Sequence, residues 1–207
     1  MYVLVENNVI TKSFSYPKGF ILNENQYSKD IFTKWTTAEK QAIGIYEVVV
    51  DKTNYRDSEY YINTNSTIAF ANNQATESWG TATAKRLNDE NAVDENNQSV
   101  LDENGVQVIN YGLKTEKKKI VKQQASGLLA PTDWYITKAT EVADYDVPAN
   151  ILSFRADVRT KSNEMETAID NCTTVDELKA LYEYTNTGTE ANPVFTRPLP
   201  EFPKEVI

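Results

Sequence analysis

The sequence predicts an α+β protein: a small β-rich domain with one short helix, then an array of three to four helices, then an extended Pro-rich arm. Short β-branched runs dominate the first hundred residues, and apolar residues recur at helical spacing from about Tyr111 onward. Four of the seven prolines stand in residues 192–207. We therefore expect a β-rich domain at residues 1–110, a helical domain at 111–187 and an arm at 188–207.

Two β-branched runs bounded by turn residues, 2–10 and 43–51, predict the first strands. The segment between them predicts a short helix, because Thr36 and Glu39 have capping-box spacing and Gly44 is a natural C-terminal stop.

Two further segments of the first half predict hairpins. Residues 59–70 have a polar centre between two apolar ends. Residues 98–109 contain Asn104-Gly105, a dipeptide that can supply the positive φ of a tight reversal.

Helical periodicity defines the second half. One helix is predicted because six residues recur at helical spacing, with the KTEKKK run on the opposite face, the six being Leu113, Lys117, Ile120, Val121, Gln124 and Leu128. Pro148 suits the first position of a longer helix, whose shared face is Ile151, Leu152, Arg155, Val158, Met165 and Ile169. A last helix begins at Thr174, which forms a second capping box with Glu177.

Between these helices, Pro131 ends the first helix or begins the next, and Thr132 or Asp133 can cap a short helix through Trp134 and Ile136. Large aromatic side chains dominate protein cores, so Trp134 is expected to be a core anchor rather than part of a ligand site.

The C-terminal segment interleaves prolines with Val194, Phe195, Leu199 and Phe202. It cannot form a helix and favours an extended conformation. Apolar residues on a stiff segment suggest that it leaves its own domain and packs on a neighbouring subunit. A disordered tail is the alternative.

Composition excludes several function classes. The chain has no histidine and one cysteine, Cys172, so the commonest general base, the commonest transition-metal ligand and any internal disulfide are missing. A net charge of -9 argues against nucleic-acid binding. No apolar run can span a bilayer, and the N-terminus does not read as a signal peptide, so synthesis in a cytoplasm is expected.

No residue pattern indicates a catalytic, cofactor or metal site. The acidic stretch from Asp94 has a calcium-loop-like start, but it lacks the central glycine and closing glutamate at the required spacing. A carboxylate-based glycosidase would need only two acidic residues, and no feature selects such a pair. We therefore predict no enzymatic activity.

The stretch from Leu129 to Arg159 resembles a module of tailed-bacteriophage proteins, found in tail-fibre-associated proteins and tail assembly chaperones. The matching residues are Leu129, Ala130, Thr132, Asp133 and Trp134, followed by Phe154, Arg155 and Arg159. Residues 34–48 resemble the front end of the same proteins. The likeness covers about half of the chain and excludes residues 54–110 and the Pro-rich segment.

The resemblance implies a structural component of a phage virion, at the tail, the baseplate or the fibre attachment, acting through protein contacts. The alternative is an assembly chaperone that is absent from the mature particle. The expected partners are other virion proteins and further copies of the chain in a symmetric assembly. Asp133 and Arg155 could form an ion pair that fixes two helices, with Trp134 packed on the stem of Arg155 or Arg159. The expected contact residues are Asp133, Trp134, Arg155, Arg159, Phe195, Leu199 and Phe202.

Overall fold

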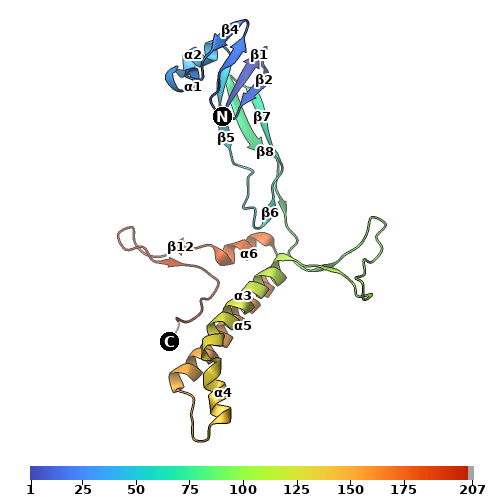
Figure 1. Cartoon of the computed structure of the whole chain (residues 1–207), viewed down its shortest axis with the longest axis vertical. Coiled ribbons are helices and arrows are strands. Elements are labelled where there is room, and N and C mark those ends of the chain that lie inside the picture. Colours follow the sequence, from blue (N-terminus) through green and yellow to red (C-terminus); the bar gives the residue numbers. More distant parts are fainter. Residues whose placement is uncertain (205–207) are drawn as a thin grey trace. The chain divides into compact units, whose positions relative to one another are not determined.

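The computed structural model describes residues 1–204, and it shows an α+β chain with strands first and helices after them (Figure 1). The chain divides into two compact units between Thr83 and Ala84, whereas the predicted boundary lay near residue 110. The shift has a simple cause: Leu113 N–H donates to the Arg86 carbonyl and Gly112 N–H donates to the Asp89 carboxylate. These bonds tie residues 84–112 to the start of a helix.

The first unit is built on a five-stranded sheet in the order β2-β1-β5-β8-β7. β5 and β8 are parallel, and the other neighbours are antiparallel. The edge strands β2 and β7 approach each other, so the sheet is strongly coiled. Its strands are β1 (Tyr2–Glu6), β2 (Val9–Phe14), β5 (Ile45–Asp51), β7 (Ser66–Ala71) and β8 (Gln74–Trp79).

Asparagine-containing dipeptides make the tight turns of this unit. Asn7 and Asn8 have φ values of 51° and 62° between β1 and β2, and Asn72 and Asn73 have 51° and 59° between β7 and β8. Such left-handed pairs match the twist of a two-residue hairpin. The hairpin expected at residues 59–70 is wrong, because β6 (Tyr61–Ile62) pairs instead with β9 (Thr83–Ala84), where the unit ends.

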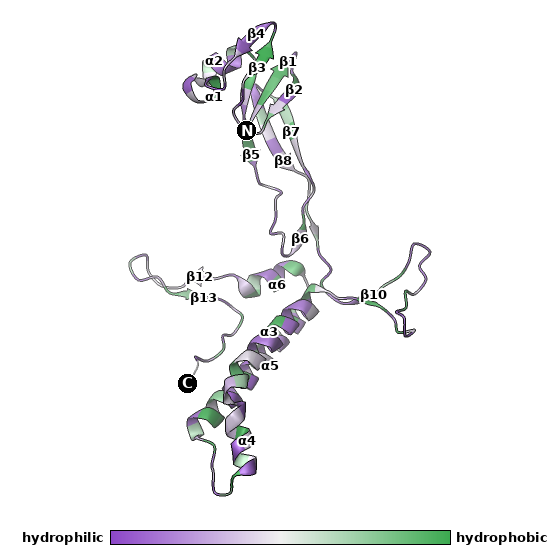
Figure 2. Cartoon of the chain, in the orientation of Figure 1, coloured by the Kyte–Doolittle hydropathy of each residue, from purple (hydrophilic) through white to green (hydrophobic). Residues whose placement is uncertain are grey.

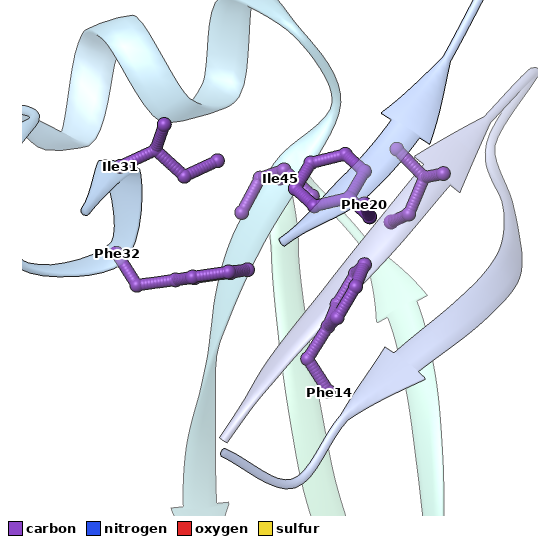
Figure 3. Packing of buried hydrophobic residues seen from close by; sticks show 6 residues of the cluster. Phe14, Phe20, Ile31, Phe32 and Ile45 are labelled. Atoms are coloured by element: carbon purple, nitrogen blue, oxygen red, sulfur yellow. The ribbon is translucent and has the colours of Figure 1, made fainter. Parts of the chain in front are cut away.

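Both faces of the sheet carry apolar side chains. One face packs against β3 (Phe20–Leu22), β4 (Asn25–Tyr27) and α1 (Ile31–Lys34) through Leu4, Phe14, Phe20, Ile31, Phe32 and Ile45 (Figure 3). The other face gathers Val3, Val5, Val48 and Ala75 inside the coil. The helix α2 (Thr37–Ala42) has the predicted Thr36–Glu39 capping box, whereas α1 was not predicted.

The second unit is built on two long helices, α3 (Leu113–Leu129) and α5 (Ala149–Asn171), which pack side by side (Figure 1). Between them stand a 3₁₀ turn η1 (Ala130–Thr132) and α4 (Asp133–Glu141). Pro148 is the N-cap of α5 rather than its first residue. The last helix, α6 (Val175–Tyr182), has the predicted Thr174–Glu177 capping box.

Most of the predicted helix faces are buried or half-buried, with three exceptions. Lys117, Val121, Ile151, Val158, Met165 and Ile169 are buried as expected. Ile120 and Leu152 are 45% and 51% exposed and Gln124 is exposed as well, because each helix contacts neighbours over a narrow stripe. A cluster of Ala125, Phe154 and Val158 joins α3 to α5.

Residues 88–112 form three short hairpins that meet at one junction, and we call this segment the three-hairpin module. β10 (Glu90–Asn91) pairs with β11 (Ile109–Asn110) as the stem, and bridges Val93–Ser99 and Leu101–Gln107 close the other two arms. At the junction three backbone bonds close a ring: Val100 donates to Ala92, Val108 donates to Val100, and Ala92 donates to Val108. The reversal at Asn104-Gly105 is confirmed, since Gly105 has a φ of 77°.

An eight-residue repeat underlies the module. Asp-Glu-Asn occurs at 94–96 and again at 102–104. The carboxylate of Asp94 accepts from the N–H groups of Asn96 and Gln98, and that of Asp102 accepts in the same way from Asn104 and Val106. The Gln107 amide then donates to all three carbonyls at the junction, those of Ala92, Val100 and Val108, at 2.9, 3.1 and 2.9 Å.

The Pro-rich segment does not leave its own unit, which corrects the predicted arm. β12 (Thr185–Asn186) pairs with β13 (Phe195–Thr196) as a hairpin. Leu199 is 2% exposed and its N–H donates to the Leu181 carbonyl on α6. Phe202 packs on the Ala125–Phe154–Val158 cluster. Leu199 and Phe202 therefore pack against helices of the same unit.

Candidate protein-contact site

Residues 129–159 form one connected site at the junction of α3, η1, α4 and α5. Arg155 projects from the buried face of α5, and its side chain is only 8% exposed. Pro131 lies inside η1, so the chain turns there and brings Thr132 and Asp133 back toward α5. The turn at η1 therefore brings Arg155 into contact with residues that lie more than 20 positions earlier in the sequence.

The guanidinium of Arg155 has three partners, all contacted through Nη1. It donates to the Leu129 carbonyl at 3.1 Å and to the Thr132 hydroxyl at 2.5 Å, and it forms an ion pair with Asp133 at 2.8 Å. Thr132 is fully buried and its hydroxyl donates to the Leu129 carbonyl. The predicted Asp133–Arg155 pair is thus present. A buried guanidinium needs such partners because the desolvation of an unpaired charge is costly.

Trp134 is not a core residue, and that prediction is wrong. Its side chain is 52% exposed, and none of the residues of α4 is buried. The indole contacts the Tyr135 ring at a tilt of 31°, with ring centroids 3.8 Å apart, and Lys138 lies 5.8 Å from its centroid. The same ammonium lies 4.2 Å from the centroid of Tyr145. The outcome is a group of aromatic rings around one lysine, in which Trp134 is exposed and Tyr135 and Tyr145 are half-buried.

Arg159 lies one turn after Arg155 on α5 and is exposed, with its guanidinium donating to the Arg155 carbonyl at 3.4 Å. It lines a shallow groove between α3 and α5 together with Lys122, Asp133, Arg155 and Ser162. Three cationic side chains against one carboxylate make this groove locally basic in an acidic protein.

The three predicted contact residues of the Pro-rich segment do not join this site as a group. Phe195 is 62% exposed on the β12–β13 hairpin, whereas Leu199 is buried beside α6. Phe202 is half-buried on the α3–α5 cluster.

The structure also describes the one cysteine and the acidic side chains of the chain. Cys172 is buried, and its burial followed by the nearby Glu177 carboxylate raises the pKa of the thiol, which keeps the thiolate scarce. Within residues 1–204, no three histidine, cysteine or acidic side chains cluster as metal ligands would. No helix of the described chain has the length and apolar character needed to cross a membrane.

Comparison with known proteins adds no relative: no protein-family model, no curated protein and no solved structure matches the chain.

Proposed function

We propose that the protein is a structural component of a tailed-phage virion, located at the tail, the baseplate or the fibre attachment, and that it acts through protein contacts. It is made in the host cytoplasm and binds other virion proteins and copies of itself. The proposal starts from the resemblance of residues 129–159 to the phage module. The observation that carries it is the exposed Trp134 on a base fixed by Arg155.

A tryptophan in this position is costly unless something covers it. Its indole exposes apolar surface to water. The position of the chain just before it is nevertheless fixed by the buried Arg155, which donates to the buried Thr132. Tryptophan, tyrosine and arginine are the residues that dominate the energy of protein interfaces. Trp134, Tyr135 and Arg159 supply this set on neighbouring surfaces of one unit.

Mass spectrometry of purified mature virions tests the proposal, because a structural component is present at a fixed copy number. A chain found only in infected-cell lysate would identify the alternative, an assembly chaperone. A phage carrying Trp134→Ala should contain much less of the protein in its particles. Tyr16→Ala is the matched control, since Tyr16 is an exposed aromatic residue, 64% exposed, in the first unit. Normal incorporation of the Trp134→Ala chain would overturn the role of this site.

A further inference from the structure

The three-hairpin module concentrates the negative charge of the protein. Residues 88–112 contain six carboxylates and no lysine or arginine, the carboxylates being Asp89, Glu90, Asp94, Glu95, Asp102 and Glu103. Asp89 and Glu90 are engaged at the base of the module by Gly112 and Arg86. The other four stand at the turns of the two outer arms.

Apolar side chains accompany these carboxylates on the outer arms. Val93, Leu101 and Val106 are 52%, 55% and 60% exposed. Val93 and Leu101 occupy the same position of the eight-residue repeat, so each arm presents one apolar side chain just before its acidic turn. Apolar groups bordered by charges of one sign are typical of a surface that another protein covers.

The opposite charge lies on the very next element. α3 carries five lysines and one glutamate in an otherwise acidic protein, and Figure 2 shows hydrophilic residues along much of this helix. An open groove follows its outer side and has three lysines against one glutamate, its lining being Tyr111, Thr115, Glu116, Lys118, Lys119, Lys122, Gln123 and Ser126. Ion pairs to Asp170 and Glu166 of α5 hold Lys118 and Lys122 in place. Tyr111, which is 61% exposed, adds an apolar ring at one end.

We propose that the outer arms of the three-hairpin module bind the α3 groove of a second copy of the same chain. Leu101 and Val106 pack near Tyr111, and Glu95 and Glu103 approach Lys119 and its neighbours. Charge complementarity selects the occupant: the arms are purely acidic and this groove is basic. The apolar contacts supply affinity that surface charges alone do not supply.

This inference rests on the proposed function, because it specifies how the copies of an assembly component contact one another. Two copies that exchange arms reciprocally form a two-fold dimer, whereas an arm that binds the groove of the next copy in one direction only makes a heterologous contact. Repetition of such a contact closes a ring or extends a filament, depending on the rotation between neighbours. The symmetric assembly expected of a tail component is one such ring.

Sedimentation velocity of the purified full chain tests the contact. The wild type should self-associate at about 0.05 M salt and dissociate at about 0.5 M salt, where screening shortens the reach of exposed charges. Glu95→Lys/Glu103→Lys and Lys119→Glu/Gln123→Glu should each weaken self-association by about tenfold or more. An equimolar mixture of these two variants should associate again, because each arm then meets a groove of opposite charge.

The matched control for the arm variant is Glu141→Lys/Glu190→Lys, which likewise replaces two glutamates by lysines, at exposed residues outside both surfaces. It should associate like the wild type. A wild type that stays monomeric at low salt overturns the proposal. Arm variants that dissociate while groove variants do not would also overturn it, since the arms would then bind another surface. The assay uses no virions, so its result is separate from that of the virion mass spectrometry.

Discussion

Arg155 on α5 and Asp133 at the first position of α4 form an ion pair of 2.8 Å in which the two partners differ in exposure. The arginine side chain is 8% exposed and the aspartate side chain is 62% exposed. If Arg155 is removed, water can hydrogen-bond to the exposed Asp133 carboxylate. If a partner of Arg155 is removed, water has little access to the buried guanidinium. The free energy of unfolding should therefore respond unequally to the two residues.

Arg155→Ala should lower the free energy of unfolding by about 2–4 kcal/mol, because it removes buried packing and leaves the Leu129 carbonyl without this donor. Asp133→Asn should cost less, about 1–2 kcal/mol, because the amide keeps an oxygen acceptor for Arg155 but removes the counter-charge of this buried guanidinium. Chemical denaturation of both variants measures the difference. Equal losses would mean that the ion pair, rather than the buried guanidinium, holds α4 to α5.

Trp134→Ala should change the free energy of unfolding by less than about 1 kcal/mol, because truncation of an exposed residue opens no cavity. The thermal midpoint should stay near that of the wild type while incorporation into particles falls. Phe154→Ala is the comparison, since Phe154 is 4% exposed and should cost about 3–5 kcal/mol. A Trp134→Ala loss as large as that of Phe154→Ala contradicts the exposed position of the indole.

Gln107→Ala should loosen the three-hairpin module and leave the helices folded. The substitution removes the amide that donates to the carbonyls of Ala92, Val100 and Val108, and each carbonyl that stays shielded from water costs about 1–3 kcal/mol. Hydrogen exchange should accelerate at residues 92–108 and not in α5. Gln98→Ala, at an exposed turn, is the control and should leave exchange unchanged.

The N-terminus of α6 should lose stability in acid. Hydrogen bonds from Thr173, first from its backbone and then from its hydroxyl, hold the pKa of Glu177 below its usual value, with a further bond from the backbone of Thr174. Because this pKa is lower in the folded chain, the contribution is complete above the unfolded pKa and is lost as the pH falls through the folded pKa. Hydrogen exchange in α6 measured across this acidic range checks it. Glu177→Gln keeps an acceptor, so exchange there should depend less on pH.

A chain that ends at Thr187 should be less stable than the full chain, since truncation removes Leu199 and Phe202 from the helical unit. Leu199→Ala alone should cost about 2–5 kcal/mol. Phe195→Ala is the control in the same segment and should have little effect, because Phe195 is 62% exposed. An unchanged thermal midpoint in the truncated chain would show instead that this segment belongs to a neighbouring subunit.

Local signals in the sequence were sufficient for most helices. Both capping boxes, Thr36–Glu39 and Thr174–Glu177, depend on residues three apart, so no tertiary information is needed to place them. The Asp133–Arg155 pair was also predictable, since the resemblance brought the two residues into one module.

Burial was harder to predict than secondary structure. The helical period of α4 cannot show that no second layer covers Trp134, and the apolar spacing of Leu199 cannot show which surface buries it. The three-hairpin module was missed for another reason: its signal is the recurrence of Asp-Glu-Asn after eight residues, a period of neither helix nor strand. A search for internal repeats would have found it.

The ring of backbone bonds among Ala92, Val100 and Val108 has a consequence for how this protein can evolve. The junction depends on main-chain groups and one glutamine, while the turns at residues 94–98 and 102–106 are exposed at their ends. Exposed loop tips tolerate substitution and insertion far better than packed elements do. Mutations at the two outer turns can therefore change the surface of the arms while the junction and the start of α3 keep their structure.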